Sequence, residues 1–267
     1  MNKDKRLEAF GRLLDVMDEL RVKCPCDRVQ TFESLRSSTI EETYELVDAL
    51  LDHDMKNVKK ELGDLLLHVI FYSKIASEEG AFDIADVADT ECDKLIFRHP
   101  HIFGAVHADT PDEVKQNWED LKLKEKEKEH EKKRVLSGVP RTLPSLVKAY
   151  RISQKAASAG FDWETKEDIW SKVQEEISEV QAAMQSGDEV NKEEEFGDLL
   201  FALVNAARLY GVNAETALEK CNKKFISRFT YIEEQAEKQG LSLRELSLAE
   251  MENWWCEAKN KAKEKTE

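Results

Sequence analysis

Two stretches of this chain carry the same acidic pattern, and this repetition constrains the fold more than any other feature. The run Glu-Glu-Thr-Tyr-Glu at 41–45 is followed, twenty residues after its start, by Glu-Leu-Gly-Asp at 61–64. The run Glu-Glu-Ile-Ser-Glu at 175–179 is followed at the same spacing by Glu-Phe-Gly-Asp at 195–198. The second copy lies 134 residues after the first, and this agreement indicates an internal duplication.

The apolar residues around these acids recur with the period of an α-helix. After Glu61 and again after Glu195, hydrophobic side chains return every three or four residues. Each residue of a helix turns by about 100°, so acids three or four positions apart share one face. Gly63 and Gly197 are poor helix formers beside an acid, and such local violations are expected at functional sites. Two acidic faces that pack together need a cation between them, and oxygen ligands favour Mg²⁺ or Mn²⁺ over zinc.

Composition favours an all-α fold with two tandem helical domains. Of the 267 residues, 36% are charged, and ten Gly and five Pro leave few positions for turns. Residues 122–142 form a run rich in Lys and Glu that ends in a Gly/Pro loop, which is typical of a linker. We therefore expect an N-terminal domain at 1–121, a charged helical extension and linker at 122–142, and a C-terminal domain at 143–267.

Net charge and hydropathy exclude several classes of partner. A net charge of −15 repels polyanions, which argues against a nucleic-acid or anionic-membrane binder. No stretch approaches the roughly 20 apolar residues of a membrane span, and the beginning of the chain has no apolar signal core, so we expect a cytoplasmic protein. The five cysteines show no repeated metal-ligand spacing, which favours reduced thiols.

The duplication extends to basic and aromatic pairs that are each spaced four residues apart. The first half contains Lys94 with Arg98 and Trp118 with Lys122, and the second half contains Lys224 with Arg228 and Trp255 with Lys259. Carboxylates that hold a metal, a Lys/Arg pair for phosphate oxygens and an aromatic ring for a base are the parts of a nucleotide polyphosphate site. A Walker-type loop is absent from the sequence, so the metal must be held mainly by protein carboxylates.

Together these motifs resemble the MazG-type nucleoside triphosphate pyrophosphohydrolases. Besides the two acidic patterns, the match includes Cys-Pro-x-Asp at 24–27, Arg-His-Pro-His-x-Phe at 98–103 and Gly-Phe-Asp-Trp at 160–163. The similarity runs from about residue 6 to residue 260. It implies two MazG-like domains whose helical bundles are completed by homodimerisation. It also implies Mg²⁺-dependent hydrolysis of nucleoside triphosphates to monophosphate and pyrophosphate with broad base tolerance.

The resemblance also implies roles for individual residues. The metal ligands would be Glu176, Glu179, Glu195 and Asp198 in the second half and Glu42, Glu45, Glu61 and Asp64 in the first half. The nucleotide would be bound by Lys172, Lys192, Lys224, Arg228, Trp255 and Lys259. As the general base we expect Glu175 or Glu194, which flank the ligands, and Glu195 is expected to be essential for catalysis.

Two departures from the family pattern bear on which half is active. Cys26 stands where tryptophan is usual, which removes an aromatic side chain near the first acidic cluster. In the family, basic residues commonly precede the second run of acids, and in this chain Asn191 and Lys192 occupy that place. The resemblance therefore does not decide which residue contacts phosphate there. We expect the second half to be the main catalytic site and the first half to serve dimerisation or regulation.

Two other classes of protein compete with this interpretation. A di-iron carboxylate oxidase would need Glu-x-x-His on two helices, and the sequence contains this motif once, from Glu127 to His130 in the charged run. A helical interaction protein with a structural metal would show metal-dependent stability without turnover. That alternative leaves the repeated basic and aromatic pairs without a role.

Overall fold

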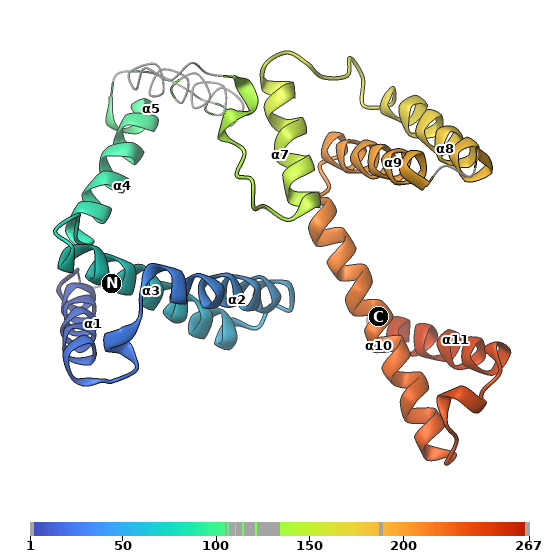
Figure 1. Cartoon of the computed structure of the whole chain (residues 1–267), viewed down its shortest axis with the longest axis horizontal. Coiled ribbons are helices and arrows are strands. Elements are labelled where there is room, and N and C mark those ends of the chain that lie inside the picture. The colour runs from blue at the N-terminus through green and yellow to red at the C-terminus, as the bar shows by residue number, and fades with distance from the viewer. Residues whose placement is uncertain are drawn as a thin grey trace. The chain divides into compact units, whose positions relative to one another are not determined.

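The chain is helical throughout the part that the structure describes. The computed structural model describes residues 3–104, residues 106, 110, 114 and 121, and residues 134–186 and 189–264. Across these ranges every regular element is a helix, and no strand occurs (Figure 1). The chain divides into two compact units, Met1–Glu129 and His130–Glu267. The prediction of an all-α fold with two tandem helical domains is confirmed, whereas the boundaries at 121 and 143 remain predictions.

The first unit is built on the antiparallel helix pair α2 (Phe32–Leu51) and α3 (Met55–Glu78). Thr31 and Asp54 cap these helices, because their side chains accept hydrogen bonds from backbone N–H groups of the first turn. The other elements are α1 (Lys3–Lys23), η1 (Asp27–Val29), α4 (Ile84–Arg98) and α5 (Pro100–Phe103). Packing of α1 against the pair creates a core of Met17, Leu35, Ile70, Phe71 and Ile75.

The second unit repeats the helix pair and adds a long helical arm. The pair consists of α8 (Ile169–Ser186) and α9 (Glu189–Leu209), and Ile169, Val173, Ala202 and Ala206 form its core. The helix α7 (Ser145–Ser158), preceded by η2 (Val135–Gly138), packs against α9. The arm consists of α10 (Ala214–Lys238) and α11 (Leu248–Glu264), which pack together and are joined through η3 (Leu243–Glu245) (Figure 1).

Matching glycines end the second helix of each pair. Gly80 follows α3 with φ 69°, and Gly211 follows α9 with φ 70°. Residues with a Cβ rarely adopt this left-handed conformation, so glycine is favoured at both turns. The repetition of the helix pair therefore extends to the turn that follows it. Trp118 and Lys122, which form one of the pairs that the sequence repeats, lie outside the described residues.

Large apolar side chains remain exposed on the outer faces of both helix pairs. On α9, Phe196, Leu200 and Leu203 are 47%, 54% and 41% exposed, and Leu62, Leu66 and Val69 on α3 are similarly exposed.

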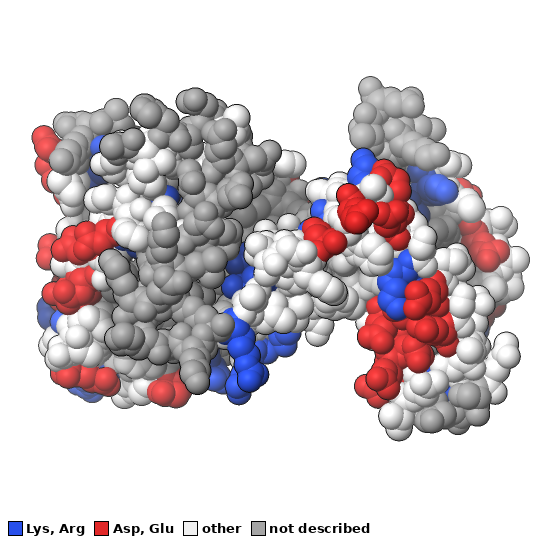
Figure 2. Space-filling view, turned by 90° about the horizontal axis from the view of Figure 1, so that it is seen from above, with Lys and Arg blue, Asp and Glu red and all other residues white. Residues whose placement is uncertain are grey.

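Acidic side chains gather densely on the right of Figure 2, with basic side chains among them. In the described part of the chain, every helix is too short or too polar to cross a membrane.

Candidate active site

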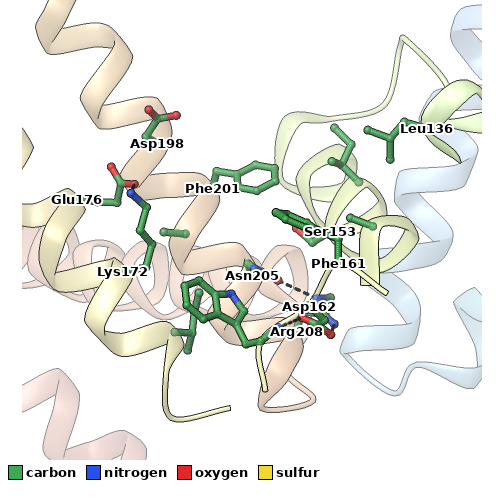
Figure 3. A pocket seen from close by; sticks show the side chains of 15 residues that line it. Leu136, Ser153, Phe161, Asp162, Lys172, Glu176, Asp198, Phe201, Asn205 and Arg208 are labelled. Carbon is green, nitrogen blue, oxygen red and sulfur yellow. Dashed lines mark hydrogen bonds and ion pairs between the residues drawn. The ribbon is translucent and has the colours of Figure 1, made fainter. Parts of the chain in front are cut away.

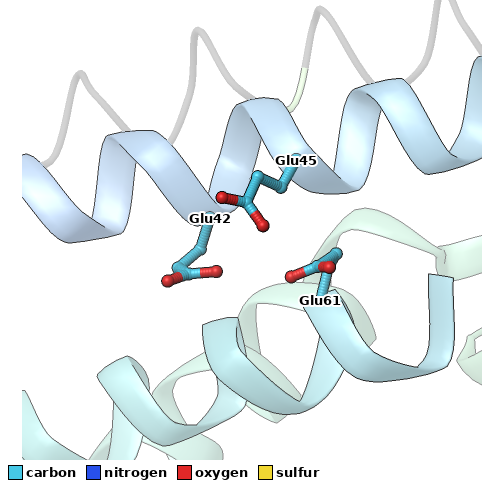
Figure 4. A group of neighbouring side chains, drawn as sticks. All are labelled: Glu42, Glu45 and Glu61. Atoms are coloured by element: carbon cyan, nitrogen blue, oxygen red, sulfur yellow. The ribbon is translucent and has the colours of Figure 1, made fainter. Parts of the chain in front are cut away.

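The acids of the first half meet between α2 and α3. Glu42 and Glu45 point from α2 towards Glu61 on α3, and one carboxylate oxygen of each lies within 4.8 Å of the others (Figure 4). The Nζ atom of Lys60 lies 2.9 Å from Glu61, 3.6 Å from Asp64 and 3.7 Å from Glu45. Burial and the neighbouring charges of Asp64, Glu45 and Glu61 raise the pKa of Glu42. A lysine of this unit therefore neutralises its own acidic cluster.

The acids of the second half meet in the same way between α8 and α9. Oxygens of Glu176, Glu179 and Glu195 also lie within 4.8 Å of one another. Here the cation comes from the other helix of the pair, because Lys172 Nζ lies 2.8 Å from Glu175 Oε1 and 2.8 Å from Glu176 Oε1. Hydrogen bonds to Glu175 and then Glu176 raise the pKa of Lys172, so the amine stays charged. Burial and then the charge of Glu176 raise the pKa of Glu179.

The two clusters differ in how the buried carboxylate is satisfied. In the first cluster the buried side chain is Glu61, and both of its oxygens accept hydrogen bonds from Lys60. In the second cluster it is Glu176, which is 4% exposed, and its Oε2 atom is buried without a hydrogen-bond partner. A buried charged oxygen without a partner is costly. The unpartnered oxygen, together with two further carboxylates, therefore fits a hard divalent cation such as Mg²⁺ or Mn²⁺.

A cavity of about 800 Å³ opens beside the second cluster. In Figure 3, Lys172, Glu176 and Asp198 lie at one end of it and Asp162 and Arg208 at the other. The lining consists of Leu136, Ile152, Ser153, Ala156, Phe161, Asp162, Trp163, Ile169, Lys172, Glu176, Asp198, Phe201, Ala202, Asn205 and Arg208. The cavity thus joins a charged end, where phosphates and a metal can bind, to an aromatic interior within the size range of small-molecule sites.

An ion pair holds the polar wall of this cavity together. Arg208 on α9 donates from Nη1 to Asp162 Oδ2 at 3.1 Å, and its Nη2 atom also contacts Asp162. The Nε atom of Arg208 donates to Asn205 Oδ1 at 2.9 Å. These bonds tie the loop that precedes α8 to α9 and fix the orientation of the Asn205 amide.

The remaining predicted site residues take several positions. Asp198 lines the cavity beside Glu176, whereas Glu194 is exposed and Lys192 is half-buried on α9. Arg228 on α10 and Trp255 on α11 come together, with the guanidinium 5.3 Å from the ring centroid. Lys224 and Lys259 are exposed on the same two helices. These four residues of the arm are not part of the cavity lining.

Sequence reasoning did not find the interior of the cavity. Phe201, Asn205 and Arg208 were missed, and the motif that contains Phe161 and Trp163 was noted without a role. A usable signal was the motif's position directly before the acidic helix. A second signal was the pair of small residues Ala202 and Ala206 in an apolar helix.

Comparisons with known proteins agree on one family. The sequence model of the MazG nucleotide pyrophosphohydrolase domain matches residues 30–103 and 164–232, so each matched range contains one acidic cluster. The chain is 43% identical to the nucleoside triphosphate pyrophosphohydrolase/pyrophosphatase MazG of Thermotoga maritima, over 94% of this chain and 95% of the relative. It is 42% identical to the nucleoside triphosphate pyrophosphohydrolase of Escherichia coli K12, over 95% of this chain and 98% of the relative. The uncharacterized protein YabN of Bacillus subtilis is 44% identical over 94% of this chain and 51% of its own length.

Proposed function

Because this chain belongs to the MazG nucleotide pyrophosphohydrolase family, we propose that it is a Mg²⁺-dependent nucleoside triphosphate pyrophosphohydrolase. As a member of that family it is a hydrolase that acts on acid anhydrides. The bond cleaved joins the α and β phosphates, and the products are a nucleoside monophosphate and pyrophosphate. The substrates are ribo- and deoxyribonucleoside triphosphates with little preference for the base.

One observation carries the proposal: the unpartnered Glu176 Oε2 atom lies in an acidic cluster at the charged end of a cavity. Glu176, Glu179 and Glu195 would hold the metal, with Asp198 on the same cavity wall. When bound there, Mg²⁺ lowers the pKa of water and neutralises the charge of the pyrophosphate leaving group. Mn²⁺ suits the same oxygen ligands.

The protein's own residues then bind the triphosphate and move a proton. Lys172 lines the cavity and contacts Glu176 of the cluster, so its ammonium group can neutralise phosphate oxygens. The attacking water forms a bond to the α phosphorus as the bond to the bridging oxygen breaks and pyrophosphate leaves. The water's proton passes to the carboxylate of Glu175 or Glu194. The family resemblance implies further contacts with the nucleotide from Lys192, Lys224, Arg228, Trp255 and Lys259.

The second half is the better candidate for the catalytic site. Its buried Glu176 keeps an oxygen for a metal, whereas both oxygens of the buried Glu61 in the first half are taken by Lys60. The first half then keeps a metal-binding cluster that serves dimerisation or regulation.

We further propose that the bundle is completed in a homodimer. The exposed side chains of Phe196, Leu200 and Leu203 form an apolar face on α9 that a second copy would cover. Light scattering coupled to gel filtration should give twice the chain mass. A monomer at micromolar concentration would count against this proposal.

Product analysis tests the reaction directly. Purified protein is incubated with Mg²⁺ and each common nucleoside triphosphate, and pyrophosphate and orthophosphate are assayed separately. Pyrophosphate and monophosphate that disappear in EDTA are expected. Orthophosphate release would mean cleavage at the β–γ bond, and no turnover of any substrate would favour the metal-binding interaction protein.

Paired variants test the assignment to the second half. Glu195→Gln should abolish turnover and leave the helical circular dichroism spectrum unchanged, because the glutamine keeps the volume and removes a ligand charge. Glu61→Gln, at the equivalent position of the first half, is the matched control and should retain turnover. Normal hydrolysis by the Glu195 variant would place the reaction elsewhere.

A further inference from the structure

Lys60 lies among the acids of the first cluster in the way that a bound cation would. Its Nζ atom lies 2.9 Å from Glu61 Oε1 and 3.2 Å from Glu61 Oε2. The same atom lies 3.6 Å from Asp64 and 3.7 Å from Glu45, so it contacts acids from both helices of the pair. We propose that the ammonium group of Lys60 takes the place of a divalent metal in the first cluster, so that Mg²⁺ binds there only when this side chain leaves.

The duplication shows that this lysine stands where the second half has an acid. With the offset of 134 residues, Lys60 corresponds to Glu194, which directly precedes Glu195. In the opposite direction, Lys172 of the second cluster corresponds to Ser38. The two halves therefore repeat the metal-ligating acids but place the lysine at different positions. In the first half the change replaces a carboxylate beside the cluster by a cation.

The two lysines also contact their clusters differently. Lys172 Nζ lies 2.8 Å from Glu175 and 2.8 Å from Glu176, and both of these acids belong to its own helix, α8. Lys60 instead joins α3 to α2, as a metal ion between the two helices would. It also donates to both oxygens of Glu61, which is 4% exposed. A cation on a buried carboxylate offsets the cost of burying that charge.

The distances around Lys60 suit an ammonium ion. Hydrogen bonds from an ammonium group to a carboxylate are about 2.7–2.9 Å long, whereas Mg²⁺ lies about 2.0–2.1 Å from its oxygen ligands. Oxygens of Glu42, Glu45 and Glu61 nevertheless lie within 4.8 Å of one another, as in the second cluster (Figure 4). The side chain of Lys60 is 60% exposed, so it can move into solvent while the helices stay packed. A metal ion therefore competes with a tethered cation for these acids.

Counting bound Mn²⁺ tests the proposal without measuring turnover. Free Mn²⁺ is quantified from its electron paramagnetic resonance signal during titration of the full-length protein. Lys60→Met removes the cation and keeps most of the side-chain volume, so the variant should bind one Mn²⁺ per chain at least about tenfold more tightly than the first cluster of the wild type, since hydrogen bonds to charged groups contribute at least that factor. Unchanged stoichiometry and affinity in the folded variant would overturn the proposal.

Two further variants locate the additional ion. Lys59→Met is the matched control, because Lys59 is exposed and lies about 100° away from Lys60 around α3, so the same charge is lost without a change in the cluster. It should bind Mn²⁺ as the wild type does, and an equal gain in both variants would refute the proposal. Combining Lys60→Met with Glu61→Gln should remove the additional ion, because Glu61 is one of its ligands. An ion that stays bound in the double variant would lie elsewhere and would also refute the proposal.

Lys60→Gln decides the question if circular dichroism shows that Lys60→Met does not fold. Its amide removes the charge and can still donate to the buried Glu61, so a gain of Mn²⁺ supports the proposal and an unchanged titration overturns it. The inference rests on the proposed function only for the choice of metal. A wild-type protein that releases no pyrophosphate would refute the proposed activity, whereas the Mn²⁺ titrations of the Lys60 variants would still give their own answer.

Discussion

Replacing Glu176 by Gln should stabilise the metal-free protein while it removes the response to Mg²⁺. The carboxylate is 4% exposed, Oε1 accepts from Lys172 at 2.8 Å, and Oε2 is buried without a partner. A buried unsatisfied polar atom costs about 1–3 kcal/mol. The glutamine keeps the acceptor for Lys172 and places an NH₂ group next to Glu179 and Glu195, which can accept from it. We therefore expect the variant to be more stable in EDTA by about 1–3 kcal/mol.

Adding the metal should shift the difference in unfolding free energy between the variant and the wild type in favour of the wild type. A site filled at about a hundred times its dissociation constant stabilises the folded state by about 2.7 kcal/mol, and the variant should lose most of this. Urea unfolding followed by tryptophan fluorescence reports mainly on the second unit, because four of the five tryptophans, Trp163, Trp170, Trp254 and Trp255, belong to it, whereas Trp118 belongs to the first. The exposed Glu233→Gln is the matched control and should respond to Mg²⁺ as the wild type does. A Glu176 variant that is less stable in EDTA, or that gains as much from Mg²⁺ as the wild type, would refute the reasoning.

Two further predictions concern stability away from the site. The hydrogen bonds from Arg21 lower the pKa of Glu78, so this pair contributes stability that is present above the unfolded pKa and is lost as the pH falls through the folded pKa. Glu78→Gln should therefore destabilise the first unit by at most about 1 kcal/mol near neutral pH. In pH-dependent urea melts this difference from the wild type should shrink as the pH falls below the ordinary glutamate pKa of about 4.3 and vanish below the lowered pKa of the folded state; a constant difference would contradict this. Gly211→Ala should lower the free energy of unfolding by about 1 kcal/mol, because the residue has a φ of 70°. Gly11→Ala should raise it by about 0.5–1 kcal/mol, because Gly11 lies inside α1 and no atom is near the added methyl group. Equal effects of the two variants in thermal melts would disprove the argument.

The helix pairs and the acidic clusters were predictable because both depend on local spacing. Acids three and four residues apart must share a helix face, and the two helices of each pair are consecutive in the sequence and pack together, so Glu176, Glu179 and Glu195 converge. The sequence did not predict which helix of each pair supplies the lysine that neutralises the acidic cluster. Lys60 and Lys172 come from different helices of their pairs, and the repeat pattern of acids does not encode that choice.

The cavity could not be predicted because it depends on distant parts of the chain. Leu136 from η2, Ile152 from α7 and Trp163 from a loop meet α9 only after the unit has packed. Periodicity reports which face of a helix is apolar, and it does not report whether the facing elements fill the space. The same limit applied to Trp255, whose contacts with Arg228 and Phe225 depend on how α10 and α11 pack.

The packing of helices against their neighbours along the chain has a kinetic consequence. In both units the helices that pack together most extensively are consecutive α-helices of the chain: α2 with α3, α8 with α9 and α10 with α11. Chains dominated by such local contacts have low contact order and fold in microseconds to milliseconds, because little loop entropy is lost before contacts form. During synthesis the first helix pair can therefore complete its fold long before the ribosome has translated the second.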